Sequence, residues 1–321
     1  VSGEGDAWLQ AALDIAAQLL DRQHCGGPED GGWRHFLSMP HTFRLEPPWL
    51  SAIAQGEAAT LFVRLHLETK DERYAEAARR ALLPMSVPVS EGGCLAFLDD
   101  APFVEEYPTD PPSFVLNGAI FALWGYRDVG VGLGDGDALR RFNELTAALV
   151  ANLHRWDTGH WSRYDLYPHP LANIASPSYH LLHIRQLEIL DRLFPHPEIR
   201  RIRDRFESYR QSASCRRRAI AQKVAFRLVL PRNDLLAHRL PYRPRNGTSG
   251  RDIIVLAYHA VSDGWRTPLA VTPRQLDAQI AYLVERGYRG VTFAEALKAR
   301  RGDKVFAVTF DDGYRSVAQL A

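Results

Sequence analysis

Glu105-Glu106-Tyr107-Pro108-Thr109 leads through a short proline-rich turn into Phe114-Val115-Leu116-Asn117-Gly118, the start of an apolar run that extends to Val129. Apolar side chains at helical spacing predict a helix over residues 114–129. Two carboxylates and a phenol therefore stand directly before a buried helix. Carboxyl and phenol groups are the side chains that transfer protons in active sites, so this stretch indicates both a helical core and a candidate site beside it.

The same periodicity predicts helix pairs on both sides of this stretch. Thr69-Lys70-Asp71-Glu72 has the capping-box pattern at the start of one helix, and Pro197 suits the first turn of another. Expected helices cover residues 8–20, 49–67, 69–83, 137–153, 178–194 and 197–209. Long loops rich in Gly, Pro and aromatic residues separate them, and such loops are usually functional. We expect a mainly α fold, an (α/α) toroid of helix pairs with the site loops at one mouth. A plain helical bundle is the alternative.

The pattern changes after residue 250. Apolar segments over 253–256 and 305–310 predict buried strands, 289–292 predicts a short strand, and helices are expected over 272–286 and 293–300. Strands that alternate with helices predict a parallel sheet, here part of an incomplete α/β barrel. The expected organisation is a toroid domain at 1–211, a basic linker at 212–250 and an α/β segment at 251–321.

The overall charge excludes few classes of binding partner, because Lys+Arg 39 and Asp+Glu 38 nearly cancel. The arginine-rich run over 200–245, densest at Arg216-Arg217-Arg218, is typical of a solvated linker or of a surface that attracts an anionic polymer or a membrane. Three scattered cysteines predict neither a disulfide framework nor a zinc cluster. No apolar run is long enough to span a bilayer, and nothing indicates nucleic-acid binding.

The chain starts at Val1 without a methionine and shows no signal peptide, so we expect it to be a piece of a longer protein. A homodimer is compatible with the sequence.

Two further tyrosines, Tyr164 and Tyr179, stand in polar, loop-like settings. A site made of tyrosines and a carboxylate, without a cysteine or a Ser-His-Asp triad, suits the removal of a weakly acidic proton from carbon. This chemistry favours sugars over peptides or phosphates. A tyrosine of ordinary pKa, about 10, is a poor base near pH 7, so positive neighbours or substrate binding would have to lower it.

Several motifs together resemble the catalytic domain of D-glucuronyl C5-epimerases over about residues 6–211. They are Gly31-Gly32-Trp33, Leu45 to Gly56, Glu105 to Gly118, Asp157-Thr158-Gly159, Tyr164-Asp165-Leu166, and Tyr179-His180 with His183-Ile184 and Gln186-Leu187. The resemblance implies an (α/α) toroid that converts D-glucuronate to L-iduronate within an acidic polysaccharide, heparosan-like or another exopolysaccharide, without a cofactor. Assembly of such a polymer suggests the cell envelope or the secretory pathway.

The resemblance also implies roles for individual residues. Glu106 and Tyr179 form the proton-transfer pair, and Tyr107 and Tyr164 position or stabilise the substrate carboxylate. Further substrate contacts are expected from Glu105, Asn117, Arg163, His180, His183, Arg34 and Arg44. One position departs from the family, because Tyr167 stands where the family has an arginine for that carboxylate. Arg163, Arg34, Arg44 or His169 could supply the missing charge.

A second resemblance covers residues 252–321. Leu256 to Val261 and Thr309-Phe310-Asp311-Asp312-Gly313 look like the opening of a polysaccharide deacetylase domain, which uses a divalent metal, usually zinc. The resemblance implies that Asp311 is the general base and Asp312 a metal ligand. The family's two metal-binding histidines should follow, and the sequence ends at Ala321 before them. We therefore expect no deacetylase activity from this chain.

Three alternatives remain open for the first domain. A polysaccharide lyase removes the same C5 proton but expels the oxygen at C4. A glycosidase could use Asp99 or Asp100 with Glu105 or Glu106. A non-catalytic carbohydrate-binding domain would bind the polymer and yield no product.

Overall fold

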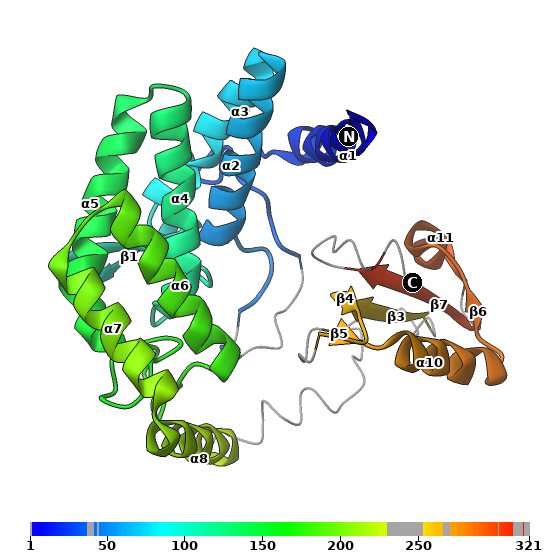
Figure 1. The fold of residues 1–321 in the computed structure, drawn as a ribbon. Coiled ribbons are helices and arrows are strands. Elements are labelled where there is room, and N and C mark those ends of the chain that lie inside the picture. Colours follow the sequence, from blue (N-terminus) through cyan, green and yellow to red (C-terminus); the bar gives the residue numbers. More distant parts are fainter. Residues whose placement is uncertain are drawn as a thin grey trace. The chain divides into compact units, whose positions relative to one another are not determined.

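The computed structural model describes residues 2–36, 42–43, 45–229, 253–265, 270–300, 302–310 and 317. The chain divides into two compact units, Val1–His238 and Arg239–Ala321. The first unit is mainly helical and the second is a small α/β unit (Figure 1). Arg44, Asp311 and Asp312, each predicted to be a site residue, lie outside the described residues.

The helices of the first unit confirm the predicted helix pairs. They are α1 (Ser2–Arg22), α2 (Ala52–Thr69), α3 (Glu72–Ala81), α4 (Leu116–Gly132), α5 (Gly136–Asn152), α6 (Pro177–Leu193), α7 (Pro197–Gln211) and α8 (Ala213–Val229). Short 3-10 turns occur at η1 (Leu83–Ser86), η2 (Val89–Glu91) and η3 (Leu153–Trp156). Pro197 occupies the first turn of α7, as expected.

The predicted capping box at the start of α3 was wrong. The α3 helix begins at Glu72 behind Asp71, whose carboxylate accepts the backbone N–H of Arg73. The Thr69 hydroxyl instead donates to the carbonyl of Leu65 in α2, 2.7 Å away. Asp71 can cap because its backbone is extended, whereas Thr69 is still the last helical residue of α2.

Consecutive helices pack in pairs, α2 with α3, α4 with α5 and α6 with α7, and α4 also packs against α2 and α6. The α2–α4 contact requires glycine. A Cβ on Gly125 would lie 2.5 Å from the Cα of Gly56, and a Cβ on Gly56 would lie 2.7 Å from the Cα of Ala122. The two backbones therefore touch, and α4 is held centrally between its neighbours (Figure 1).

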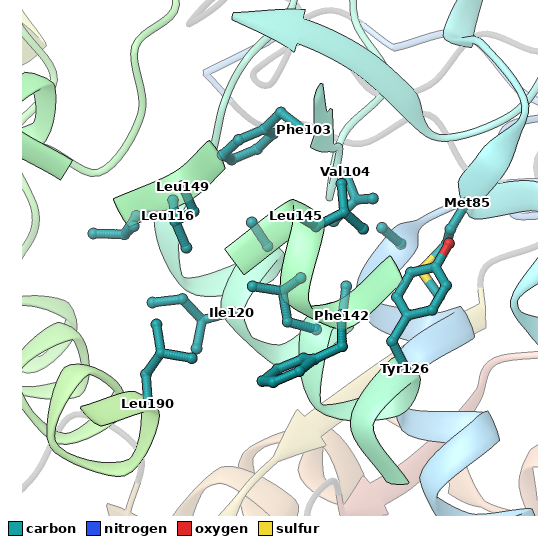
Figure 2. Packing of buried hydrophobic residues seen from close by; sticks show 14 of the residues in the cluster. Met85, Phe103, Val104, Leu116, Ile120, Tyr126, Phe142, Leu145, Leu149 and Leu190 are labelled. Atoms are coloured by element: carbon teal, nitrogen blue, oxygen red, sulfur yellow. The ribbon is translucent and has the colours of Figure 1, made fainter. Parts of the chain in front are cut away.

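The core of this unit lies between α4, α5 and α6 and the strands beside them. Ile120 on α4 and Leu190 on α6 are fully buried, and Phe142 on α5 is 2% exposed (Figure 2). Such a core fixes the N-terminal end of α4, where the predicted site residues lie.

Two segments differ from the loops and linker that the sequence predicts. The proline-rich loop before α4 contains an antiparallel hairpin, β1 (Leu95–Leu98) with β2 (Ala101–Val104). Residues 213–229, expected in the basic linker, form α8, which packs against α7. The hairpin strands have four residues each and show no pattern in the sequence, whereas the apolar run over 219–230 favours a packing helix within the basic stretch. Among the described residues, no helix is both long and apolar enough to cross a membrane.

The second unit contains the predicted parallel sheet. Strands β3 (Ile253–Tyr258), β7 (Val305–Phe310) and β6 (Arg289–Gly290) pair in the order β3-β7-β6, all parallel. Helices α10 (Pro273–Glu285) and α11 (Phe293–Lys298) start at capping boxes of Thr272 and Thr292. A small parallel pair, β4 (Ala260–Val261) and β5 (Ala270–Val271), completes the described elements.

Candidate active site

Glu105 is a structural anchor for the loop that precedes α4. Its side chain is fully buried, and its carboxylate accepts hydrogen bonds from the Ser113 hydroxyl, 2.5 Å away, and from the Phe114 N–H, 2.9 Å away. Phe114 has a left-handed backbone with φ 50°, which is costly for a side chain of this size. The Glu105 carboxylate therefore stabilises the unusual turn that directs the chain into α4, and it points away from solvent.

Burial raises the pKa of Glu105 from its ordinary 4.5 to about 7, even though Ser113 and Phe114 donate to the carboxylate. A carboxyl group whose pKa is raised on folding stabilises the native state below its unfolded pKa. This contribution is lost as the pH rises through the folded value.

Glu105→Gln is therefore expected to weaken the pH dependence of folding. The free energy of unfolding of the unsubstituted chain should fall between pH 4.5 and about 7. That range corresponds to roughly 3 kcal/mol for one group, as an upper bound. The glutamine variant cannot titrate at residue 105, so its free energy should fall less. Urea denaturation at both ends of the range measures this. The exposed Glu91→Gln should keep the full slope, and an equal slope in Glu105→Gln would contradict the anchor role.

The next residue, Glu106, faces the N-terminal end of α4. Its side chain is buried, and the Asn117 amide donates to it at 3.4 Å. A Cβ on Gly118 would lie 2.2 Å from the Glu106 Oε2 atom. The absence of a side chain at Gly118 thus creates the space in which the Glu106 carboxylate sits against the helix.

Three tyrosines gather around Glu106. The Tyr107 side chain lies close enough to the Glu106 carboxylate, and Tyr164 close enough to Tyr107, for each pair to influence the other's pKa. The rings of Tyr164 and Tyr179 meet edge to face, with centroids 5.1 Å apart. Tyr179 is 41% exposed, whereas Tyr164 is buried, so the cluster opens to solvent on the Tyr179 side. The structure therefore brings together the four residues predicted to carry the chemistry.

The electrostatics of this cluster separate the carboxyl group from the phenols. Burial raises the pKa of Glu106 to about 7, and the charge of Glu57 on α2 adds to the effect. Burial, followed by the nearby Glu106 charge, also raises the pKa values of Tyr107, Tyr164 and Tyr179. The lowered tyrosine pKa that a tyrosinate base would require is therefore not present in this structure. Near neutral pH the phenols keep their protons, and Glu106 alone changes charge.

Behind Tyr164, a second buried network holds its loop. Asp165 is fully buried, and the Asn173 amide donates to it at 2.5 Å. Lys223 on α8 donates to the Asn173 side chain at 2.8 Å and to the Ile174 carbonyl at 2.6 Å. Burial raises the pKa of Asp165 to about 7 and lowers that of Lys223 to about 8. Helix α8 therefore contributes directly to the position of the Tyr164 loop.

His180 and His183, predicted to contact substrate, both lie in the core of the unit. The Ser162 hydroxyl bridges their Nδ1 atoms at 2.7 and 2.9 Å, and His180 Nε2 donates to the Phe206 carbonyl at 2.9 Å. His180 also stacks on Trp161 with centroids 3.8 Å apart. Burial lowers their pKa values to about 4 and about 3. Two neutral histidines therefore join α6 to the loop around Ser162.

The cations proposed to replace the family arginine lie in different places. Arg34 is bound to Glu29 through its Nε atom at 2.6 Å. Arg163 is half-buried on the Tyr164 loop, its pKa is lowered by burial, and its Nε has no hydrogen-bond partner among the described residues. His169 stacks on Phe43 and lies 3.6 Å from Asp165. Among these three cations, Arg163 is the one whose Nε–H has no hydrogen-bond partner among the described residues.

Tyr167 itself belongs to an aromatic cluster beside the site. The Phe43 ring lies between Tyr107 and Tyr167, with centroid distances of 5.6 and 5.3 Å. Tyr167 also packs against His169 at 4.7 Å. The phenol at this position thus supports Tyr107 through Phe43.

A groove of about 540 Å³ lies on α2, α4 and α6 and includes Glu57. Glu57, which lines this groove, also contributes to the raised pKa of Glu106 through its charge. Arg64, Arg127 and Trp124 line it further along the helices. A second pocket, of about 470 Å³, is lined mainly by residues of α3, α4 and α5, and none of the four clustered residues lines either pocket.

Sequence patterns did not indicate Glu57, Lys223, or the close approach of Gly118 to Glu106 as parts of the site. Glu57 follows directly after the Leu45 to Gly56 motif, and Gly118 ends the motif that contains Asn117. Lys223 lies outside every motif, and only its contacts with Asn173 and Ile174 reveal it.

Comparisons with known proteins match the helical unit to a known family. Residues 27–208 match the family described as D-glucuronyl C5-epimerase C-terminus. The chain is 33% identical over 159 residues to a D-glucuronyl C5-epimerase of Caenorhabditis elegans, a match that covers 45% of this chain and 26% of the relative. It is 30% identical over 162 residues to an uncharacterized protein of Methanocaldococcus jannaschii, covering 49% and 50%.

Among solved structures, the cellobiose 2-epimerase of Spirochaeta thermophila matches with a TM-score of 0.41 and 17% identity, over 61% of this chain and 53% of that one. The chain spans between a quarter and a half of the length of the curated relatives it matches. The family match ends at residue 208, so the deacetylase resemblance stays a prediction. More than half of the chain lies within the match, and the chain belongs to the D-glucuronyl C5-epimerase C-terminus family.

Proposed function

We propose that the helical unit inverts C5 of D-glucuronate residues within an acidic polysaccharide to give L-iduronate. The observation that supports this most directly is the cluster of Glu106 with Tyr107, Tyr164 and Tyr179 at the end of α4. One carboxyl group with a pKa near 7 and three protonated phenols suit a reaction that removes one proton and returns another. We also propose that the helix pairs belong to an (α/α) toroid.

In this proposal, Glu106 is the base toward the glucuronate epimer. The Glu106 carboxylate takes the C5 hydrogen as a proton, and the electron pair of the broken C–H bond delocalises into the substrate carboxylate as an enediolate. The Tyr179 hydroxyl then delivers a proton to the opposite face of C5. Solvent restores the tyrosine proton and removes the proton from Glu106, so no atom or electron is gained or lost overall. The reverse reaction exchanges the two roles, and ionisation of Tyr179, whose pKa is raised in this structure, then has to accompany binding of the L-iduronate residue.

Tyr107 and Tyr164 would stabilise the enediolate. Their pKa values are raised, so both are neutral donors, and a neutral donor placed in a buried site stabilises developing charge without itself being ionised. Arg163 is the cation proposed to neutralise the substrate carboxylate in place of the family arginine. The reaction needs charge stabilisation and no redox step, so the proposal includes no organic cofactor.

The groove on α2, α4 and α6 is the proposed path of the sugar chain beyond the reacting residue. Replacing both Arg64 and Arg127 by glutamine is expected to raise KM for a uronate polymer about tenfold and to leave kcat nearly unchanged, because cations at a distance bind ground and transition state alike. Steady-state kinetics test this. Arg73→Gln, an exposed change on α3, is the control, and an unchanged KM in the double variant would exclude this path.

One incubation in heavy water separates the proposed function from its alternatives. The unsubstituted chain is mixed with a glucuronate-containing polymer and followed by NMR. Epimerisation predicts deuterium at C5 and new L-iduronate signals. An unsaturated product would identify a lyase, new reducing ends a glycosidase, and an unchanged polymer a binding domain. Any of these three results would overturn the proposal.

We also propose that residues 252–321 are the start of a polysaccharide deacetylase domain. Its support is the parallel register of β3 and β7, in which Tyr258 pairs with Phe310. The two strands therefore end at the same sheet edge, where α/β folds place their sites, and in the sequence His259 follows the first strand and Asp311 the second. The described residues contain no group of three or more His, Cys, Asp or Glu side chains that could hold a metal. A metal at Asp312 would thus depend on residues outside the described set.

Cobalt binding by the whole chain tests the deacetylase proposal. Asp312→Asn is expected to weaken binding, as followed by visible absorption, whereas Asp303→Asn on an exposed turn should not. Equal affinity in the two variants would remove Asp312 from the ligand set.

A further inference from the structure

Helix α8 has two different faces. Its inner face packs onto the helical unit through buried Ala219 and Phe226, and through Lys223 and Gln222, which bond to the Tyr164 loop. Its outer face carries three aliphatic side chains that contact little of the described structure. They are Ile220, Val224 and Leu228, which are 59%, 54% and 79% exposed.

The three exposed side chains form one ridge. Their spacing of four residues places them along the same side of the helix, two full turns in length. Single exposed apolar residues are normal on protein surfaces, but a continuous ridge on one helix indicates an interaction surface. Because the opposite side of α8 is already fixed to the unit, the ridge faces outward.

Positive charge surrounds this ridge. Helix α8 contains five basic residues and no acidic one, in the sequence ASCRRRAIAQKVAFRLV. Arg217, Arg218 and Arg227 are exposed beside the aliphatic side chains. Helix α7 differs, since its arginines pair with neighbouring acids, as in Arg201–Glu198 and Arg210–Glu207. The charge on α7 is therefore largely compensated, whereas no arginine of α8 forms an ion pair with an acid among the residues that the structure describes.

The sequence that follows α8 has the same bias. Residues 230–245 add Arg232, Arg239, Arg243 and Arg245 against the single acid Asp234. The exposed arginines of α8 attract an anionic partner over a range set by the salt concentration, and the composition of residues 230–245 has the same sign.

We propose that the outer face of α8 docks on the surface of a bilayer that contains anionic phospholipid. A basic helix with an aliphatic ridge lies in the interface of such a membrane, with the ridge among the acyl chains and the arginines at the headgroups. Basic residues close to an anionic leaflet are attracted to it within a range set by the salt concentration. An anionic polysaccharide would satisfy the arginines but offers nothing to Ile220, Val224 and Leu228, so the ridge distinguishes the two partners.

Vesicle sedimentation tests this docking independently of catalysis. The whole chain should sediment with vesicles of phosphatidylcholine and phosphatidylglycerol at low salt, and not with phosphatidylcholine alone. The triple variant Ile220→Ser, Val224→Ser, Leu228→Ser should bind the anionic vesicles at least tenfold more weakly. The matched control Ile15→Ser, Leu67→Ser, Val131→Ser changes three exposed aliphatic residues on other helices and should bind as the unsubstituted chain does.

Several results would overturn the proposal. One is equal binding by the ridge variant and its control; another is no binding of the unsubstituted chain to anionic vesicles. A third is a dependence on Arg217→Gln and Arg218→Gln without any dependence on the ridge, which would indicate a polyanion site. Circular dichroism verifies that each variant is folded. Epimerisation of a soluble polymer should not change in the ridge variant, so failure of docking and failure of the proposed epimerase activity are distinguishable.

Discussion

Replacing Glu106 with glutamine is expected to lower the rate of C5 inversion by a factor of about 10² to 10⁴, the usual contribution of a general base. The amide has nearly the size of the carboxyl group and still fits against Gly118, so the fold should be kept. It cannot accept a proton from carbon. The loss should therefore appear in kcat, with KM for the polymer little changed.

The pH profile gives a second signature of Glu106. Burial raises its pKa to about 7, and the base must be ionised to act. The value of kcat/KM for the unsubstituted chain should therefore rise with pH through about 7 and level off above it. The exposed Glu68→Gln on α2 is the control and should keep both rate and profile. A Glu106→Gln variant with the full rate would remove Glu106 from the chemistry.

Tyr179→Phe is the second change with a large expected effect. The phenylalanine ring keeps the edge-to-face contact with Tyr164, so the variant removes one hydroxyl and little packing. If that hydroxyl delivers the proton to the second face of C5, inversion should fall by about 10² to 10⁴. The rate of L-iduronate formation by NMR measures the effect.

Tyr126→Phe is the matched control for Tyr179→Phe. Its hydroxyl lies 3.3 Å from the Ser86 hydroxyl, away from the four clustered residues, so this change also removes one hydroxyl but should leave the rate within a few-fold. A similar loss of activity in both variants would point to stability and not to proton delivery.

The helices were predictable because their evidence is local. Apolar residues at helical spacing predicted α2, α4 and α6, and apolar runs predicted the strands β3 and β7. The predicted burial of residues 253–256 was wrong, because these β3 side chains are half-buried or exposed. The β1–β2 hairpin was missed, since each strand has four residues and a proline lies within β2.

The candidate site was predictable in its members but not in their division of roles. Glu105 and Glu106 are adjacent and chemically identical, yet one stabilises the turn at Phe114 and the other faces the tyrosines. Their roles differ because the backbone directs the Glu105 side chain toward Phe114 and the Glu106 side chain toward the tyrosines. His180 and His183 likewise resemble site residues in sequence, but Ser162 and the Phe206 carbonyl bind them in the core.

Helix α8 shows why contacts distant in sequence are hard to predict. Its basic composition predicts a linker and its apolar run over 219–230 favours a packing helix, but the partners of its inner face become evident only from Lys223 and Phe226, which contact residues about 50 positions earlier in the chain. No pattern within the sequence of α8 indicates that it packs on the loop that contains His169, Asn173 and Ile174. The family match, which ends at residue 208, does not include this helix.

The most direct test of the central claim is hydrogen–deuterium exchange at C5. It is measured for Glu106→Gln and for Tyr179→Phe, with D-glucuronate and with L-iduronate as the substrate residue. If Glu106 and Tyr179 serve opposite faces of the ring, each variant should exchange the C5 hydrogen of at most one epimer for deuterium, without inversion. Glu106→Gln and Tyr179→Phe should then differ in the epimer that they exchange. Inversion and full exchange of both epimers by both variants would contradict the account.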